Sequence, residues 1–307
     1  MCMRNYRGAD FNGGYPLTEL SLADIHKIFP RDFLQQIERI NFNGNLGDFG
    51  LAHDALDIVN YMLENTTASI NIETNGGMRT PDWWAQLANS RISVMFALDG
   101  LADTHSLYRQ DTDWQRVIDN AQALIQAGGR AIWKFIPFEH NEHQIESCRT
   151  LCKELGFESF AVYDQGRNRG PVFNRDGTLS HWLGPQQPDP DFGDMLESHV
   201  TWFDKNKDWS FLPQGEINCF HKSNQEIYIA ADGSVYPCCW LGFYPKTMRH
   251  PGMKQVAPLL ERNNALEHDL ASCLEWFEKV EKTWNRSSVS DGRLFTCVST
   301  CVNRNSH

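Results

Sequence analysis

Short apolar runs alternate with stretches of helical periodicity between residues 37 and 164. Helical segments separate the runs and carry apolar residues three or four positions apart. The runs, rich in β-branched residues, are IERINF (37–42), ASINIE (68–73), RISVMFAL (91–98), RAIWKFI (130–136) and ESFAVY (158–163). Strand–helix alternation implies parallel strands joined by crossover helices. The sequence therefore predicts an α/β protein built on a partial TIM-like barrel.

A further helix is expected ahead of these strands, over LTELSLADIHKIF (17–29). In such a barrel each helix follows a strand, and no strand pattern precedes this one. We therefore predict a partial (β/α)6 barrel that lacks its first strand. We place this barrel at 1–165, a linker or loop region rich in Gly, Pro and Asp at 166–215, and a small cysteine-rich domain at 216–307.

Composition limits the classes of function. Of the 307 residues, 41% are hydrophobic, which is typical of a globular protein, and the formal net charge is −11. A general nucleic-acid binder needs a basic surface, so no nucleic-acid partner is expected. No apolar run is long enough to span a bilayer, so we expect no membrane partner and a cytoplasmic location. Cysteines stay reduced there, and nine of them indicate metal binding or chemistry more than disulfides.

Polar or glycine-rich turns close four of the predicted strands. They are NGNLGD (43–48), ETNGG (73–77), ALDG (97–100) and PFEHN (137–141). The carboxyl ends of parallel barrel strands meet on one face, where active sites are built. Gly and Asn also make ordinary tight turns, and that interpretation stays open. Four such turns in succession favour a shared ligand site.

Six of the nine cysteines lie in the last third of the chain. This region also contains a hairpin pattern around ADGS in EIYIAADGSVYPCCWLG and a helical pattern in ALEHDLASCLEWFEKVEKTW. Thiolates from a loop, a hairpin end and a terminal pair suit a zinc ion or an iron–sulfur cluster. The expected ligands are Cys219, Cys238, Cys297 and Cys301.

The other cysteines receive different interpretations. Cys238 and Cys239 are adjacent, so in a strand only one points toward a metal, and the choice stays open. Cys273 lies in the helical pattern and is expected in the core. Cys148 and Cys152 are four apart on a predicted helix, where packing is favoured over ligation.

Together these features resemble the radical S-adenosylmethionine superfamily, in the branch with a C-terminal twitch or SPASM-type auxiliary iron–sulfur domain. The hallmark of that family is a CxxxCxxC loop after the first barrel strand, and MCMRN looks like the end of it, with Cys2 as the third cysteine. The resemblance implies that Cys2 is a catalytic-cluster ligand and that the sequence is N-terminally truncated. Only Cys2 of the three thiolates is present in this region.

The resemblance also implies residues for S-adenosylmethionine. NGNLGD looks like the Gly-Gly-Glu-Pro loop that binds the methionyl amino group, with Asp48 where Glu is common. ETNGG looks like the family's TNG turn. ALDG looks like its SxDG motif, with Ala97 in place of Ser, and an arginine ten residues later is expected to pair with the cofactor carboxylate. The implied cofactor-binding residues are Gly44, Asn45, Gly47, Asp48, Thr74, Asn75, Asp99 and Arg109.

GSVYPCC resembles the auxiliary-domain motif GxVxPC, which assigns Cys219, Cys238, Cys297 and Cys301 to an auxiliary [4Fe–4S] cluster. The implied cofactors are S-adenosylmethionine, a catalytic [4Fe–4S] cluster with an incomplete ligand set, and this auxiliary cluster. The implied activity is cleavage of S-adenosylmethionine to a 5′-deoxyadenosyl radical that abstracts hydrogen. Expected partners are a peptide, protein or small-molecule substrate and an electron donor such as flavodoxin or ferredoxin.

Two other interpretations are retained. The barrel could be a degenerate, non-catalytic scaffold or binding protein with a C-terminal structural iron–sulfur or zinc site. It could also belong to an unrelated hydrolase or isomerase with a structural zinc. The sequence shows no acid, base or nucleophile constellation in favour of the latter.

Overall fold

The structure, a computed structural model, describes residues 5–10, 17–163, 170–185, 187–206, 208–243 and 253–302. The chain divides into two compact units. The sheet unit comprises Met1–Phe11 and Pro30–Phe192, and the cysteine unit comprises Asn12–Phe29 and Gly193–His307.

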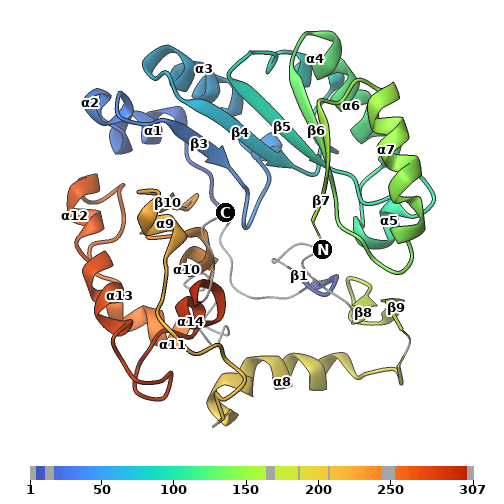
Figure 1. The fold of residues 1–307 in the computed structure, drawn as a ribbon. Coiled ribbons are helices and arrows are strands. Elements are labelled where there is room, and N and C mark those ends of the chain that lie inside the picture. The colour runs from blue at the N-terminus through green and yellow to red at the C-terminus, as the bar shows by residue number, and fades with distance from the viewer. Residues whose placement is uncertain are drawn as a thin grey trace. The chain divides into compact units, whose positions relative to one another are not determined.

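A five-stranded parallel sheet organises the sheet unit (Figure 1). Its strands follow one another in chain order and are β3 (Arg39–Phe42), β4 (Ser69–Thr74), β5 (Ile92–Ala97), β6 (Arg130–Phe135) and β7 (Ser159–Val162). Each neighbouring pair is parallel, with Ile70 opposite Ile40 and Ile92, for example. The predicted strand–helix alternation is therefore confirmed for these five strands.

Helices cover one face of this sheet, as Figure 1 shows. They are α3 (Ala55–Asn65), α4 (Pro81–Ala85), α6 (Trp114–Gln126) and α7 (Ile145–Glu154). Successive strand residues point to opposite faces, so alternate positions line the covered face. Ile70, Ile72, Val94, Phe96 and Trp133 are all almost completely buried there.

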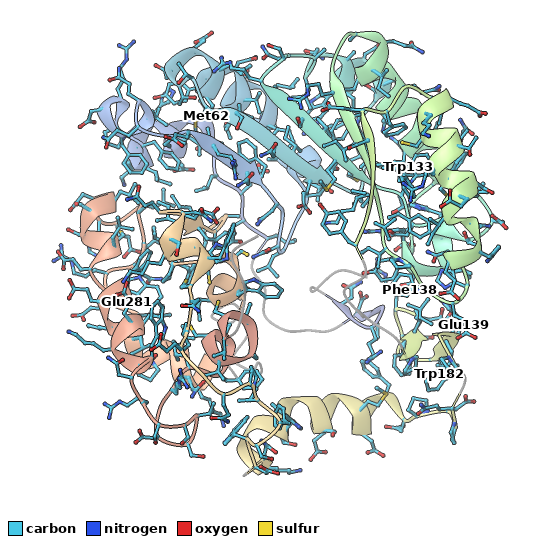
Figure 2. The ribbon with its side chains drawn as sticks, viewed as in Figure 1. Met62, Trp133, Phe138, Glu139, Trp182 and Glu281 are labelled. Atoms are coloured by element: carbon cyan, nitrogen blue, oxygen red, sulfur yellow. The ribbon has the colours of Figure 1, made fainter. Side chains whose placement is uncertain are left out.

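Local signals explain where these helices begin. Pro81 occupies the first turn of α4, where its missing N–H costs nothing, and the Asp113 carboxylate caps α6 by accepting from the Arg116 amide. Cys148 and Cys152 of α7 are buried, as the packing interpretation expects. The indole N–H of Trp133, labelled in Figure 2, donates to the Leu98 carbonyl at 2.8 Å, which satisfies its polar group in the core.

The other sheet face carries polar side chains. Asn71 Nδ2 donates to Asn41 Oδ1 at 2.9 Å, across β4 and β3. Lys134 Nζ of β6 lies 2.7 Å from Glu73 Oε2 of β4 and 4.6 Å from the ring centroid of Tyr163. This face is therefore built for contact with polar groups, whereas the helix-covered face forms the apolar core.

The sheet unit also contains two small hairpins and short helices. The hairpins are β1 (Asn5–Tyr6) with β2 (Ala9–Asp10) and β8 (Gly170–Phe173) with β9 (Leu179–Leu183). The short helices are α2 (Arg31–Leu34), η1 (Phe49–Leu51), α5 (His105–Tyr108) and η2 (Glu142–Gln144). Residues 170–183 thus form a hairpin where the sequence predicts a loop, because buried Val172, Phe173 and Leu183 lie between turn-forming residues.

The cysteine unit consists mainly of helices around one short hairpin. The hairpin pairs β10 (Tyr228–Ile229) with β11 (Val235–Tyr236) around the ADGS turn. The helices are α1 (Leu22–Ile28), α8 (Phe192–Lys205), α9 (Phe220–Ser223), α10 (Cys239–Phe243), α11 (Met253–Val256), η4 (Ala257–Leu259), α12 (Leu270–Leu274), α13 (Phe277–Thr283) and α14 (Phe295–Cys301).

Three segments differ from the sequence prediction. Residues 192–205 form a helix inside the predicted linker, and α1 groups with the cysteine unit, where Lys27 donates to the Leu266 carbonyl. The predicted long helix over 265–284 is two helices instead. They separate at Trp276, whose buried indole N–H donates to the Val235 carbonyl at 3.3 Å.

Candidate functional site

The carboxylate of Asp48 joins the first two strand-end turns. Its Oδ1 accepts from the Thr74 hydroxyl at 2.8 Å and the Gly50 amide at 3.0 Å, and its Oδ2 accepts from the Asn75 amide at 2.8 Å. A carboxylate offers about four acceptor positions. Asp48 therefore fixes the turns at 43–48 and 73–77 against each other and retains acceptor capacity on Oδ2.

Thr74 and Asn75 have different places in this arrangement. Thr74 is only 5% exposed, and its hydroxyl also accepts from the Gly76 amide at 2.9 Å. Thr74 therefore holds the turn in place from the buried side. Asn75 is partly exposed, and its Oδ1 accepts from the Gly77 amide at 2.9 Å. Its Nδ2 is used by no hydrogen bond within the described residues, which leaves that donor to a ligand.

The first turn itself depends on Gly44. Gly44 adopts φ +52°, and a Cβ there would lie 2.6 Å from the Gly47 carbonyl oxygen. The Gly47 amide donates back to the Gly44 carbonyl at 3.3 Å, with Asn45 between them. A Cβ at Gly47, in contrast, would meet nothing within 4 Å. Only the first of these two glycines is therefore required by the fold of the turn.

Asp99 is the most tightly held polar residue at the strand ends. It is fully buried, its Oδ1 accepts from the Ile136 amide at 2.6 Å, and its Oδ2 accepts from Arg109 Nε at 2.6 Å. Its own amide donates to His105 Nδ1 at 3.2 Å. A buried carboxylate needs such partners to remain charged, so Asp99 ties the end of β5 to the end of β6 and to α5.

Arg109 carries the positive charge of this group. Burial alone would lower the pKa of Arg109, but the charges of Asp99 and Asp48 oppose this, and the net pKa lies above its ordinary value. Its Nε is occupied by Asp99, and its guanidinium lies 5.1 Å from the Tyr108 ring centroid. No hydrogen bond within the described residues uses its Nη atoms. Those atoms can bind a carboxylate with two parallel bonds.

Three buried amide side chains, not predicted as site residues, hold the same turns. Asn141 donates to the carbonyls of Asp99 at 3.2 Å and Ile136 at 3.1 Å, and accepts from the Phe138 amide at 2.6 Å. Gln144 Oε1 accepts from the Leu101 amide at 2.9 Å, and Asn120 Nδ2 donates to the Gly76 carbonyl at 2.7 Å. Asn141 and Gln144 follow a predicted strand, and Asn120 lies within a predicted helix. Polar residues at such positions are a weak signal, because exposed loops and helix faces contain the same residues.

Two histidines near these turns are shielded from solvent by burial. Burial lowers the pKa of His105 to about 4, so its ring is neutral at pH 7. Because Nδ1 of His105 accepts from the Asp99 backbone amide, the ring proton of His105 is on Nε2. Burial also lowers the pKa of His140, whose ring stacks on Phe138 at 5.4 Å. Figure 2 labels Phe138 on the loop that follows β6.

The four predicted auxiliary ligands lie together in the cysteine unit. Cys238 and Cys297 belong to one buried cluster, and the Cys301 thiol shares a hydrogen bond with the Cys219 sulfur. This shared bond lowers the pKa of Cys219 and raises that of Cys301. Burial raises the pKa of Cys238 and raises that of Cys297 to about 12. Cys238, Cys297 and Cys301, whose pKa values are raised, would therefore lose their protons when a metal binds.

The four cysteines supply the ligand type that an iron–sulfur cluster needs. Cys301 interacts electrostatically with Cys219, Cys297 and Cys238. Within the part of the chain that the structure describes, no three or more Cys, His, Asp or Glu side chains form a group that could hold a metal ion. A [4Fe–4S] cluster binds each thiolate through a different iron, so its ligands need not converge on one point.

The remaining predicted cluster ligand, Cys2, lies outside the described residues. In the family that the sequence resembles, three thiolates hold the catalytic cluster. The given sequence contains one cysteine, Cys2, in the corresponding region. The residues present therefore do not fit that cluster.

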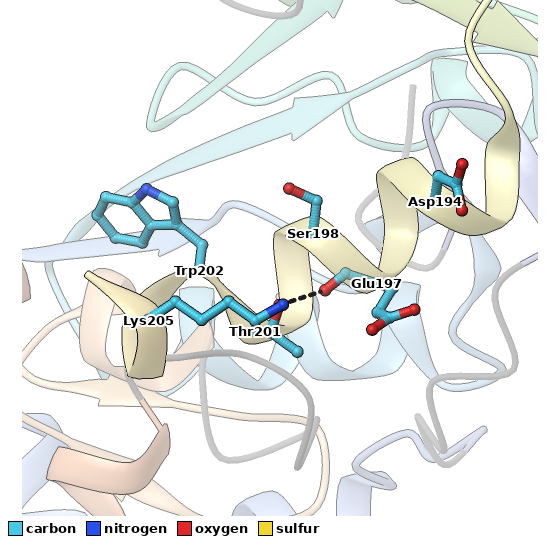
Figure 3. Close-up of a pocket in the computed structure, with 6 residues that line it drawn as sticks. All are labelled: Asp194, Glu197, Ser198, Thr201, Trp202 and Lys205. Atoms are coloured by element: carbon cyan, nitrogen blue, oxygen red, sulfur yellow. Dashed lines mark hydrogen bonds between the residues drawn. The ribbon is translucent and has the colours of Figure 1, made fainter.

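A surface pocket of about 250 Å³ follows one side of α8 (Figure 3). The Thr201 hydroxyl donates to the Glu197 carbonyl at 2.9 Å, one turn earlier in the same helix. The residues that line the pocket are Asp194, Glu197, Ser198, Thr201, Trp202 and Lys205. Because one helix supplies all of them and no predicted site residue is among them, this pocket is separate from the candidate site.

Comparison with solved structures identifies the fold. The chain is similar to native anSMEcpe with bound AdoMet (S-adenosylmethionine), with a TM-score of 0.55, 13% sequence identity, and coverage of 98% of this chain and 85% of that one. It is also similar to Streptococcus suis SuiB bound to S-adenosylmethionine, with a TM-score of 0.50 and 13% identity over 85% of this chain. Both structures hold S-adenosylmethionine. The chain is therefore similar in fold to these two S-adenosylmethionine-bound proteins.

A third structure with this fold is native anSMEcpe with bound AdoMet and Cp18Cys peptide. It has a TM-score of 0.51 and 12% identity, and the match covers 97% of this chain and 89% of that one. The chain spans 61% of the length of SuiB. No protein-family model matches the sequence. No curated protein matches it either. Among the described residues, no helix is both long and apolar enough to cross a membrane.

Proposed function

We propose that this chain is part of a radical S-adenosylmethionine enzyme, in which the sheet unit binds S-adenosylmethionine and the cysteine unit holds an auxiliary [4Fe–4S] cluster of the twitch or SPASM type. The observation that carries the proposal is the linked group of Asp48, Asp99 and Arg109 at the strand ends, in a fold shared with AdoMet-bound structures.

The chain's own residues provide complementary groups for the methionyl end of the cofactor. Arg109 offers its Nη atoms to the carboxylate, and the remaining acceptor capacity of Asp48 suits the ammonium group. Asp99 and Thr74 are buried and hold these groups in position. Gly44, Asn45, Gly47 and Asn75 complete the turns that face the cofactor in this proposal.

S-adenosylmethionine, if held by Arg109, Asp48 and the turns around them, would supply the radical chemistry that removes a substrate hydrogen. Cys2 alone does not fit a catalytic cluster, so we assign no electron-transfer step to residues of the described chain. Their task is to bind and orient the cofactor and to exclude water from the apolar side of the site.

The proposed substrate is a peptide or protein. One solved structure of this fold holds a peptide together with AdoMet. The polar sheet face of this chain presents the Asn41–Asn71 pair and the Lys134–Glu73 ion pair. These donors and acceptors suit the backbone amides and charged groups of a peptide. A net charge of −11 weighs against a nucleic-acid substrate.

We further propose a reduced flavodoxin or ferredoxin as the electron donor and a cytoplasmic location, where thiols and clusters stay reduced. The proposal is tested by anaerobic reconstitution with iron and sulfide, followed by calorimetric titration with S-adenosylmethionine. We expect about four irons per chain and saturable cofactor binding. A colourless protein that retains zinc and ignores S-adenosylmethionine would contradict both parts.

A non-catalytic scaffold with a C-terminal structural metal site is the second candidate. Both candidates predict an auxiliary cluster. They differ in reductive cleavage, because a scaffold leaves S-adenosylmethionine intact after dithionite reduction. Detection of 5′-deoxyadenosine by mass spectrometry therefore supports the enzyme, and its absence from a protein that holds two clusters, about eight irons, supports the scaffold.

A further inference from the structure

The indole N–H of Trp284 is a buried donor beside the cysteines of the candidate auxiliary site. Its indole Nε1 is shielded from solvent and makes no hydrogen bond of ordinary geometry within the described residues. Trp284 ends helix α13 and packs against the buried cluster that contains Cys238 and Cys297. Buried N–H groups are nearly always paired, so this one calls for an acceptor.

The acceptor beside Trp284 is the sulfur of Cys297. Trp284 interacts with this sulfur as a hydrogen-bond donor, although the contact is not a complete hydrogen bond in the present geometry. A neutral thiol is a weak acceptor, whereas a thiolate ligand carries negative charge and is a much better one. The Trp284 N–H therefore gains a strong acceptor when Cys297 binds the cluster as a thiolate.

A cation lies near the same indole. Lys222 Nζ is 5.7 Å from the Trp284 ring centroid, and Lys222 also forms an ion pair with Glu281, which Figure 2 labels. The side chains of Lys222 and Glu281 are partly exposed, at 57% and 38%. A cation near an indole ring draws electron density from it, which makes the N–H a stronger donor.

We propose that Trp284 donates a hydrogen bond to Cys297 when that cysteine binds the auxiliary cluster, that this bond raises the reduction potential of the cluster, and that Lys222 strengthens the effect. The inference rests on the proposed auxiliary cluster. Its physical basis is that one-electron reduction adds negative charge to the cluster and its sulfurs, and a donor to a sulfur stabilises the reduced form.

The test is a mediated redox titration of the reconstituted protein, followed by electron paramagnetic resonance. Trp284→Phe keeps an aromatic ring and removes the donor. We expect the ratio of reduced to oxidised cluster at a fixed potential to fall about tenfold, which is about 59 mV for one electron. Lys222→Met should shift the potential in the same direction by a smaller amount.

Trp276→Phe is the matched control. Trp276 lies in the same buried cluster, but its indole N–H donates to the Val235 carbonyl. We expect this variant to keep the wild-type potential. If Trp284→Phe also keeps the wild-type potential, or if Trp276→Phe shifts it equally, the inference is wrong while the auxiliary cluster stands.

A second measurement does not depend on the folding of a core variant. In wild-type protein labelled with 15N-indole tryptophan, electron–nuclear double resonance of the reduced cluster should show a coupled indole nitrogen. A cluster without such a coupling would contradict the inference. A wild-type protein that binds no iron–sulfur cluster would overturn the proposed auxiliary function and this inference with it.

Discussion

The Nε atom of Arg109 lies 2.6 Å from Oδ2 of the fully buried Asp99, ten residues earlier in the chain. This contact fixes one edge of the guanidinium and leaves the other edge to bind a ligand. Asp99 also accepts from the Ile136 amide, so the position of Arg109 is set by the ends of two strands. A preorganised arginine of this kind loses little entropy when it binds a carboxylate.

We predict that Arg109→Lys weakens binding of S-adenosylmethionine. Lysine keeps the positive charge but cannot bind Asp99 and a ligand carboxylate at the same time with fixed geometry. The expected cost is about 2 kcal/mol, which is about thirtyfold in Kd. Isothermal titration calorimetry under anaerobic conditions measures it.

Arg130→Lys is the control for this change. Arg130 makes an exposed two-bond ion pair with Glu158 outside the candidate site, so its replacement should leave cofactor affinity unchanged. Equal affinities for wild type and Arg109→Lys would show that Arg109 does not contact the cofactor.

A second prediction concerns Asp48→Asn. The amide oxygen can still accept from the Thr74 hydroxyl, but Nδ2 cannot accept from the Asn75 amide, so one of the two links between the turns is lost. We expect a loss of about 1–3 kcal/mol in the free energy of unfolding and weaker cofactor binding. Urea unfolding monitored by circular dichroism checks the first effect. Asp57→Asn, at an exposed position in the first turn of α3, should leave cofactor binding unchanged and lower the free energy of unfolding by less than about 1 kcal/mol.

The sequence predicts the sheet well but not the side chains that hold the turns. Alternating apolar runs are a strong local signal, and all five predicted strands are present. Asn141 and Gln144 give no comparable signal, because their importance depends on contacts with residues about 40 positions away. Tertiary contacts also override local periodicity at Trp276, where one predicted helix becomes two.

The family resemblance likewise predicts which residues form the site but not which of them are buried. The structure brings Asp48 into contact with Thr74 and Asn75, and it brings Asp99 into contact with Arg109. Both groups form because their members lie at the carboxyl ends of adjacent elements. What the resemblance did not indicate is that Thr74 and Asp99 are buried and act by positioning other groups. Motif matching identifies residues by spacing, whereas burial follows from packing.

The pKa of His105 predicts a dependence of stability on pH. Burial lowers this pKa from 6.5 to about 4 in the folded state, so the unfolded chain binds the proton more readily. The contribution of neutral His105 to the free energy of unfolding is therefore fully present above pH 6.5. It is lost as the pH drops toward 4, by up to about 3 kcal/mol. His105→Asn keeps an acceptor for the Asp99 amide and has no titrating group.

Urea unfolding of wild type and His105→Asn at pH 7 and pH 5 isolates this contribution. We expect wild type to lose more stability than the variant between these two values. The same pH dependence in both proteins would mean that His105 is not the responsible group.

The choice between Cys238 and Cys239 can be settled by iron content. Cys238 is buried in the cluster with Cys297, whereas Cys239 is partly exposed at the first position of α10. We predict that Cys238→Ala lowers the iron bound after reconstitution to a small fraction of the wild-type amount. Cys239→Ala should bind iron as wild type does. The reverse result would assign the ligand to Cys239.

The last prediction separates backbone strain from crowding in the second turn. Gly76 and Gly128 both have positive φ, at +70° and +88°, so alanine at either position pays about 1 kcal/mol for that conformation. A Cβ at Gly76 would also lie 2.6 Å from Phe96 Cδ1 and 2.9 Å from Val117 Cγ1, whereas one at Gly128 meets nothing within 4 Å. Gly76→Ala should therefore lose about 1–3 kcal/mol more than Gly128→Ala. It should also weaken cofactor binding, because the same displacement moves Thr74 and Asn75. Thermal unfolding and calorimetric titration of the two variants side by side provide the comparison, and equal losses would show that the turn at 73–77 adjusts without cost to the core.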